Sequence, residues 1–253
     1  MKLEIKLLDK YDDDELMENC KQEIQFLNRI KSANVIRCFE SFYEKNYIYI
    51  SLEFADDIDL ETKINIMRQR GTIFSERKIW YYFHQICNGL KDIHHAKILH
   101  RDLKPANIFM CKNGVIKIGD LGLACLVHDE TKLEKSSIGT EYYKAPERLE
   151  KDGYHFPSDI WSLGCLLYEL CTFRSPFSGE LSNAFSLHKR IKTAEIIQFP
   201  MNIYSEPLNF LIFSCLNIYP DERPSAEKCH FASRRMYVLW EKMFLEYKCG
   251  KIV

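Results

Sequence analysis

The segment from His100 to Gly122 brings together the residue types that transfer of a phosphoryl group requires. It carries a carboxylate at Asp102, a cation at Lys104, an amide at Asn107 and a second carboxylate at Asp120. Such a transfer needs a base that orients the attacking hydroxyl, a cation on the phosphate, and metal ions that bridge the phosphate oxygens. Asp102 is suited to be the base, and Lys104 points the same way if the chain between them is extended. Asn107 and Asp120 offer oxygen ligands of the kind that Mg²⁺ prefers.

A predicted β-hairpin would bring the two metal-binding candidates together. Apolar stretches at 108–110 and 115–118 flank the pair Asn113-Gly114. Asn-Gly between apolar strands is a strong signal for a two-residue turn. The returning strand places Asp120 back beside Asn107, so that both side chains can share one metal ion.

Strands are predicted to dominate the first part of the chain. Residues 2–6 alternate between charged and apolar side chains, as a strand does. The acidic stretch 12–15 signals the start of a helix that continues to about residue 30. Residues 34–54 predict two strands joined by a turn at 44–46, and the polar stretch 55–60 predicts a linker.

Helices are predicted to dominate the rest of the chain. Ser75 is placed to cap a helix that ends at His94 and His95, where a cation is mildly favoured and no metal ligation is expected. The apolar face of this helix is formed by Ile79, Phe83, Ile86, Leu90 and Ile93. Residues 159–171 predict a buried helix. A last helical stripe, which we expect to pack on the core before a stop at Gly250, consists of Met236, Leu239, Trp240, Met243, Phe244 and Tyr247.

Composition narrows the class of protein. The chain has 253 residues, 46% of them hydrophobic, which is enough for one large or two-lobed domain. Its formal net charge of −1 favours neither nucleic acid nor an anionic membrane as a partner. The ten cysteines form no CxxC pair, so we expect reduced thiols in a cytoplasmic or nuclear protein. We find no signal-peptide pattern, and no apolar run reaches the roughly 20 residues of a membrane helix.

Several ordered motifs resemble those of the protein kinases. The stretches "HRDLKPAN", "DLG", "APE", "SDIWSLG" and "DERPSA" follow one another in the kinase order. The stretches "GDLGLA" and "IGTEYYKAPERL", with Leu121 in the middle of "DLG", most resemble the NIMA-related serine/threonine kinases, over roughly residues 3–230. The resemblance implies an α+β, bilobal kinase fold with a truncated small sheet lobe and a large helical lobe. It divides the chain into a truncated N-lobe at 1–55, a C-lobe at 56–230 and a C-terminal helical extension at 231–253.

The resemblance also implies roles for single residues of the reaction centre. Asp102 would be the catalytic base, Lys104 would hold the γ-phosphate of ATP, and Thr140 would contact both and shape the substrate groove. Asn107 and Asp120 would bind Mg²⁺. A lysine two residues after the aspartate of "HRD", here Lys104, is the pattern of kinases that phosphorylate serine and threonine. The implied substrate is therefore a protein with such hydroxyls.

Nucleotide binding would involve residues from the first part of the chain. Lys6 in "LEIK" would meet the α- and β-phosphates, with Lys2 as a competing assignment, and Glu23 would be its helix partner. The backbone of Glu53 and Ala55 would meet the adenine. The implied cofactors are therefore ATP and Mg²⁺.

Other residues would act by supporting or regulating the site. Asp159 would hold the backbone of the catalytic loop. Glu147 would pair with Arg223 in the large lobe. Ser136 matches the activating phosphorylation position, where a phosphate added by an upstream kinase could pair with Arg101. The alternative is that Ser136 or Ser137 is simply a polar loop residue.

One kinase element is missing from the sequence as it stands. Kinases cover the ATP phosphates with a glycine-rich loop, whereas the first glycine here is Gly71. The first hypothesis is therefore a serine/threonine kinase whose sequence is incomplete at its start. The alternative is a natural, catalytically impaired scaffold or binding module. A small-molecule phosphotransferase is disfavoured by the protein-kinase-like stretch around "GTEYYKAPE".

The resemblance carries expectations about the setting of the protein as well. It implies a role in cell division and a cytoplasmic location, with the nucleus and the centrosome or cytoskeleton as further compartments. No nucleic acid or membrane partner is expected.

Overall fold

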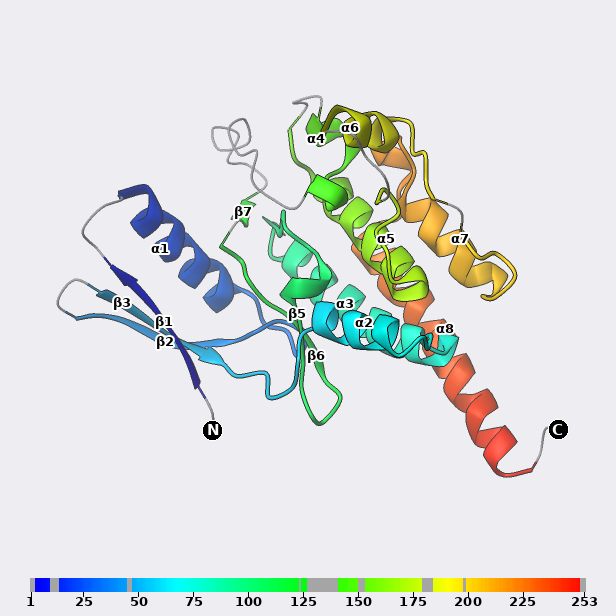
Figure 1. Ribbon diagram of the computed structural model, residues 1–253. Coiled ribbons are helices and arrows are strands. Elements are labelled where there is room, and N and C mark those ends of the chain that lie inside the picture. Colours follow the sequence, from blue (N-terminus) through cyan, green and yellow to red (C-terminus); the bar gives the residue numbers. More distant parts are fainter. Residues whose placement is uncertain are drawn as a thin grey trace.

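A three-stranded antiparallel sheet and one helix form the first part of the structure, which is a computed structural model (Figure 1). It describes residues 3–9, 14–44, 47–122, 124–126, 141–149, 153–178, 184–197 and 199–250. Strand β1 (Leu3–Asp9) precedes helix α1 (Asp14–Arg29), and strands β2 (Cys38–Glu44) and β3 (Tyr47–Glu53) follow. The strand order is β1-β3-β2, so β1 lies at an edge among the described strands. The two predicted strands of 34–54 and the first helix are confirmed, whereas residues 45–46 of the predicted turn lie outside the described part of the chain.

Alternation along β3 shows why this segment forms a strand. Ile48 and Ile50 are fully buried, whereas Tyr47, the first residue of the strand, is exposed. This period of two turns one face of the sheet toward the core. The register pairs Lys6 of β1 and Ser41 of β2 with Ile50 of β3. Helix α1 buries Cys20, Ile24 and Leu27, and it contacts β2.

Two helices follow the linker to the larger, helical part. Helix α2 (Leu60–Gln69) is capped by Asp59, whose Oδ1 accepts the backbone N–H of Thr62 at 2.8 Å. Helix α3 (Glu76–His95) begins after Ser75, which occupies the capping position without a side-chain hydrogen bond. The apolar face predicted for α3 is confirmed. All its members are fully buried, namely Ile79, Phe83, Ile86, Leu90 and Ile93.

Four short strands and one 3₁₀ turn carry the residues of the segment 100–122 and its neighbours. They are β4 (Ile98–Leu99), the 3₁₀ turn η1 (Pro105–Asn107), β5 (Ile108–Met110), β6 (Ile116–Ile118) and β7 (Cys125–Leu126). The predicted hairpin β5–β6 is confirmed, but its turn is longer than predicted. Ile108 lies opposite Ile118, and the Cys111 N–H donates to the Val115 carbonyl oxygen at 2.9 Å, so three residues (112–114) form the turn in place of the expected two. A two-residue turn of this kind needs positive φ at both central positions, and of that pair only the glycine adopts it. Gly114 at its turn has φ +87°, a conformation that glycine adopts without strain. A Cβ there would also lie 2.2 Å from the Tyr81 hydroxyl.

The remaining elements build the helical part around one buried helix. They are η3 (Glu141–Tyr143), α4 (Pro146–Leu149), α5 (Phe156–Thr172), α6 (Ala184–Lys192), α7 (Glu206–Cys215), η4 (Pro220–Glu222) and α8 (Ala226–Lys248). Every residue of α5 from 158 to 171 is buried, as expected for a helix that is apolar all round. Sheet and helices together confirm the α+β class and the bilobal arrangement (Figure 1).

The last helix corrects one prediction. Helix α8 runs without a break across residue 230, packs along α3, and its red end projects past the other helices in Figure 1. Met236 and Trp240 pack on the core as predicted, but Leu239, Met243 and Tyr247 are 47%, 43% and 67% exposed. The stripe spans a wider arc than the single neighbouring helix covers. The helix also ends beyond that neighbour, so part of the stripe faces solvent.

Two further features bear on the class of protein. All ten cysteines are free thiols, and eight of them are buried. Within the described residues, no helix is long and apolar enough to cross a membrane.

Candidate active site

Two side chains of the segment 100–122 converge on one carboxylate. The Lys104 Nζ atom lies 2.7 Å from Asp102 Oδ2. The Asn107 side-chain amide donates to the Asp102 carbonyl oxygen at 2.8 Å and to Asp102 Oδ2 at 3.1 Å. The turn η1, opened by Pro105, folds the chain back so that these residues meet. The predicted juxtaposition of Asp102, Lys104 and Asn107 is therefore present.

The second candidate metal ligand sits at the end of the hairpin. The Gly119 N–H donates to the Asn107 carbonyl oxygen at 3.0 Å, which ties the strand before Asp120 to Asn107. Asp120 has φ +58° and is exposed, whereas Leu121 is 1% exposed. The left-handed backbone at Asp120 thus separates a polar side chain at the surface from an anchor in the core.

Glu23 of α1 approaches the same turn from the sheet side. Its side chain is 4% exposed. A Cβ placed on Gly122 would lie 3.8 Å from Glu23 Oε2 and 3.2 Å from Asp120 Oδ1. Glycine at this position therefore lets the two carboxylates flank the turn. Lys6 is confirmed to lie in β1, opposite Ile50, but its side chain lies outside the described part of the chain, as does Lys2.

The linker between the two parts is held by backbone and side-chain contacts. The Glu53 N–H donates to the Arg37 carbonyl oxygen at 2.8 Å, and Glu53 Oε1 lies 2.8 Å from Lys117 Nζ. Lys117 also donates to the Ala33 carbonyl oxygen at 2.9 Å. Within the described residues, the backbone groups of Ala55 have no hydrogen-bond partner. They are open to a ligand, as the expected adenine contact requires.

Asp159, at the start of α5, holds the backbone of the catalytic segment as the resemblance implied. Its carboxylate accepts the N–H of His100 at 2.9 Å and that of Arg101 at 3.0 Å. It also accepts from the Tyr154 hydroxyl and lies 2.9 Å from His94 Nε2. Burial by itself would raise the pKa of Asp159, but the hydrogen bond and charge of His94 outweigh it and lower the pKa to about 2.

His94 makes a contact with the candidate site that the sequence did not reveal. It was expected only to favour the end of α3, yet it is buried and serves as a partner of Asp159. The two residues are 65 positions apart in the chain. No local spacing could signal a contact over that separation.

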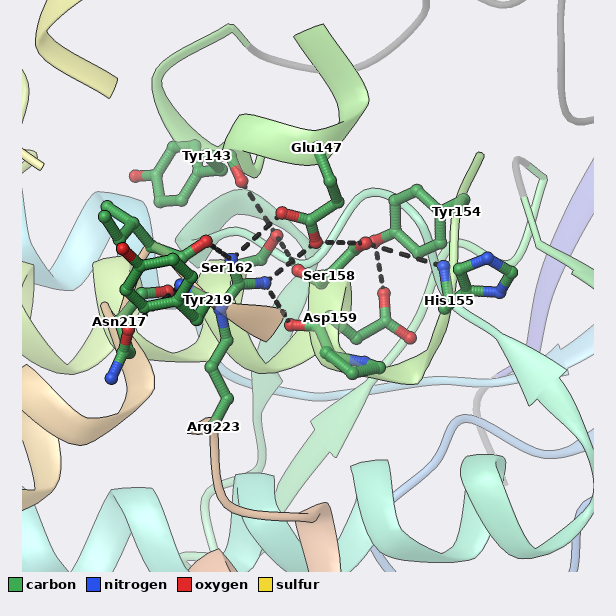
Figure 2. A network of polar contacts seen from close by, with 12 residues as sticks. Tyr143, Glu147, Tyr154, His155, Ser158, Asp159, Ser162, Asn217, Tyr219 and Arg223 are labelled. Carbon is green, nitrogen blue, oxygen red and sulfur yellow. Dashed lines mark hydrogen bonds and ion pairs between the residues drawn. The ribbon is translucent and has the colours of Figure 1, made fainter. Parts of the chain in front are cut away.

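The expected pair of Glu147 and Arg223 is present, as Figure 2 shows. Arg223 Nη1 and Nη2 donate to the two Glu147 oxygens at 2.8 and 2.9 Å. Arg223 donates further to the carbonyls of Asn217 and Pro157, and Ser158 donates to Glu147 at 2.7 Å. Burial acts to raise the pKa of Glu147, but the hydrogen bonds and charge of Arg223 outweigh it, so the pKa is lowered.

Ser136 and Thr140 of the expected activation stretch lie outside the described residues. Arg101, the expected phosphate partner, lies with its guanidinium carbon 5.9 Å from the centre of the Tyr154 ring. Arg148 lies over the same ring at 4.6 Å. With Lys144 they line a small recess beside Asp102. Sequence reasoning missed Arg148 and Lys144, which add positive charge to that place.

Comparison with known proteins agrees with this geometry. The protein kinase domain family matches residues 2–232 of the chain. The chain belongs to the protein kinase family. Serine/threonine-protein kinase Nek5 of Homo sapiens is 42% identical over 209 residues, which cover 82% of this chain and 29% of that protein. Serine/threonine-protein kinase Nek1 of Mus musculus is 36% identical over 242 residues, which cover 94% of this chain and 20% of that protein.

Nek3 of Mus musculus is a third relative, 38% identical over 209 residues that cover 83% of this kinase chain and 40% of that protein. The kinase thus spans less than half the length of these relatives. The resemblance to NIMA-related kinases is confirmed, since these relatives are Nek kinases.

Kinase domains in general use ATP and Mg²⁺, and the residues present here fit both. Mg²⁺ is usually bound by one or two carboxylates together with substrate phosphates rather than by an all-protein cage. Within the described residues, no group of three or more His, Cys, Asp or Glu side chains could hold a metal by itself. The Asn107 amide uses its nitrogen to hold Asp102, so its oxygen can face a cation. With exposed Asp120 it forms a donor set of the expected kind.

Proposed function

We propose that this kinase transfers the γ-phosphate of Mg²⁺-bound ATP to serine and threonine hydroxyls of proteins. The observation that carries the proposal is the convergence of Lys104 and Asn107 on Asp102 Oδ2, at 2.7 and 3.1 Å. A carboxylate held this way can orient the acceptor hydroxyl. The ammonium group beside it can meet the transferred phosphate.

Each residue of the proposed reaction centre then has a defined role. Asp102 accepts the hydrogen bond of the acceptor hydroxyl and takes its proton. Asn107 fixes the position of Asp102, and Lys104 provides positive charge at the phosphate. Bound Mg²⁺, held by Asn107 and Asp120, would neutralise the charge of the phosphates. Asp159 keeps the backbone before Asp102 rigid, because it accepts the N–H groups of His100 and Arg101.

Nucleotide binding and regulation complete the proposal. Lys6 would pair with Glu23 and meet the α- and β-phosphates, and Glu53 and Ala55 would meet the adenine through their backbone. Glu23 is buried beside the turn that carries Asp120, and this position supports its proposed role in nucleotide binding.

Two further residues belong to the activation stretch. Thr140 would shape the substrate groove, and a phosphate on Ser136 would pair with Arg101. The positive surroundings of Arg101, with Arg148 over the same ring, support an anion at this place. A role in cell division and a cytoplasmic setting rest on the resemblance to NIMA-related kinases alone.

The alternative is a kinase-like binding module without catalysis. The retained Asp102, Asn107 and Asp120 favour the enzyme, because a module that only binds proteins has no chemical need of them.

Nucleotide binding is tested by thermal unfolding of the chain with and without millimolar Mg²⁺ and ATP. Ligand at about ten times its Kd stabilises the folded state by about 1.4 kcal/mol, so the unfolding midpoint should rise. The Asp120→Asn variant should lose much of the Mg²⁺-dependent part of the shift. If wild type shows no shift at millimolar nucleotide, this chain does not bind ATP and the enzyme proposal fails.

A further inference from the structure

A groove of about 540 Å³ lies beside the linker, and neither Asp102 nor Asp120 lines it. Its walls come from the linker, α2, the start of α3 and the β5–β6 hairpin. The Asp57 N–H donates to the Met110 carbonyl oxygen at 3.2 Å, and the Tyr81 hydroxyl donates to that of Gly114 at 2.7 Å. These bonds join the walls to one another, so the groove is preformed and a ligand need not order it.

Positive charge dominates the walls. The lining cations are Lys63, Arg77, Lys78 and Lys112, whereas the one lining carboxylate is Asp57. Arg77 is matched by Glu241 of α8, at 2.6 Å. Lys63, Lys78 and Lys112 have no carboxylate within ion-pair distance among the described side chains. The groove therefore carries more positive than negative charge, even with Asp57 in its lining and the carboxylate of Asp56 accepting the Lys112 N–H at 2.9 Å.

Lys78 lies close to other positive charges of the groove. Its Nζ atom lies 4.6 Å from the centre of the Tyr81 ring and 4.7 Å from that of Tyr82. Burial lowers the pKa of Lys78, and the positive charges of Arg77 and Lys63 lower it further. A negatively charged ligand in the groove would relieve this repulsion.

Apolar surface lies between these charges. Ile73 is 55% exposed, and Met67, Phe74 and Met110 line the same groove. Side chains of this kind accommodate a leucine- or phenylalanine-sized group. A purely ionic ligand, such as a free phosphate or a nucleic-acid backbone, would leave that surface unused.

We propose that the groove binds an acidic segment of a partner protein, in which Asp or Glu side chains flank an apolar one. The acidic groups would meet Lys63, Lys78 and Lys112, and the apolar group would pack near Ile73. Complementary charge of this type gives specificity and speeds association. The proposal goes beyond catalysis, and binding is measured directly, so its outcome is independent of whether the chain transfers phosphate.

Fluorescence anisotropy with a short fluorescein-labelled peptide of alternating Glu and Leu tests the proposal on the whole chain. We expect saturable binding that weakens as salt is raised, and no binding of the same peptide with Lys in place of Glu. The double variant Lys63→Glu/Lys112→Glu should weaken binding by about tenfold or more, equivalent to about 1.4 kcal/mol. Lys78→Met, which keeps the apolar stem, should weaken it less.

The matched control is Lys189→Glu/Lys228→Glu, which makes the same change in net charge at two exposed positions outside the groove. It should bind the acidic peptide as wild type does at moderate salt. Equal weakening by both double variants would show a non-specific charge effect and overturn the proposal. So would the absence of saturable binding, or tighter binding of a single-stranded RNA oligonucleotide than of the peptide.

Discussion

The side-chain amide of Asn107 donates to both the carbonyl and the carboxylate of Asp102, at 2.8 and 3.1 Å. The residue proposed to bind the metal therefore also sets the position of the proposed base. Both functions depend on one side chain in which nitrogen faces the base and oxygen faces the cation. Substitution of Asn107 can separate the two functions.

Replacing Asn107 with aspartate keeps an oxygen ligand but removes the donor. Two carboxylates would then lie about 3 Å apart, and their repulsion should raise the pKa of Asp102. We expect the acid limb of the pH profile of kcat to move to higher pH, with kcat lowered by about 10²-fold or more. Asn107→Ala removes the donor without adding a charge, so it should lower kcat and move that limb less than Asn107→Asp does. An unchanged limb in Asn107→Asp would show that Asn107 does not position the base.

His94 should matter for stability and for the order of the catalytic loop, because it is a buried partner of Asp159. The His94→Leu variant leaves a buried carboxylate with one donor fewer, and we expect a loss of about 2 kcal/mol in the free energy of unfolding. Urea denaturation measures it. The neighbouring His95 is exposed, so His95→Leu is the matched control and should change little. Equal effects of both variants would contradict the assigned role.

The pair of Glu147 and Arg223 should dominate the polar contribution to stability in the helical part. Glu147→Ala leaves the guanidinium of Arg223 buried without its carboxylate, which typically costs about 3–5 kcal/mol. The exposed pair of Lys242 and Glu246, at 3.8 Å, provides the comparison, and Lys242→Ala should cost less than about 0.5 kcal/mol. Urea denaturation of both variants checks this. A small loss in Glu147→Ala would mean that the pair is dispensable.

The structure shows which parts of this site a sequence can predict. Asp102, Lys104 and Asn107 lie within one turn of chain, and Asn113-Gly114 specifies the hairpin locally, so their arrangement follows from short-range rules. Contacts between distant segments, such as that of His94 with Asp159, depend on how α3 packs against α5. That packing has no signature in the spacing of residues.

The same distinction explains the surface features that were missed or mispredicted. The cations of the groove come from three segments, α2, α3 and the β5–β6 hairpin, and only the fold brings Lys63 into the same groove as Lys112. For α8, an apolar stripe indicated a helix correctly. It did not show that the neighbouring helix would cover only part of the stripe, so the exposure of Leu239 and Tyr247 was not predicted.

The contact of α8 with α3 should depend on pH through His84. Its ring stacks on Tyr237 with centres 4.4 Å apart, and burial lowers the pKa of His84 below the ordinary value of 6.5. The folded state therefore binds fewer protons than the unfolded state just below pH 6.5, so its stability is full above that pH and falls as pH drops. His230, whose pKa burial also lowers, adds to the same trend.

Urea midpoints between pH 7.5 and 5.5 measure this dependence. The variant His84→Phe keeps an aromatic ring on Tyr237 but cannot titrate, so its midpoint should fall less over that range than the wild-type midpoint. Identical slopes for the two proteins would show that His84 is not responsible.

The most direct test of the central claim is the transfer of radiolabelled γ-phosphate from Mg²⁺-bound ATP to a general protein substrate such as casein. The account predicts incorporation that requires Mg²⁺, that appears on serine and threonine in phosphoamino-acid analysis, and that Asp102→Asn reduces by about 10³-fold or more while the fold is retained. Incorporation by the wild-type chain that is no greater than that of Asp102→Asn would contradict it.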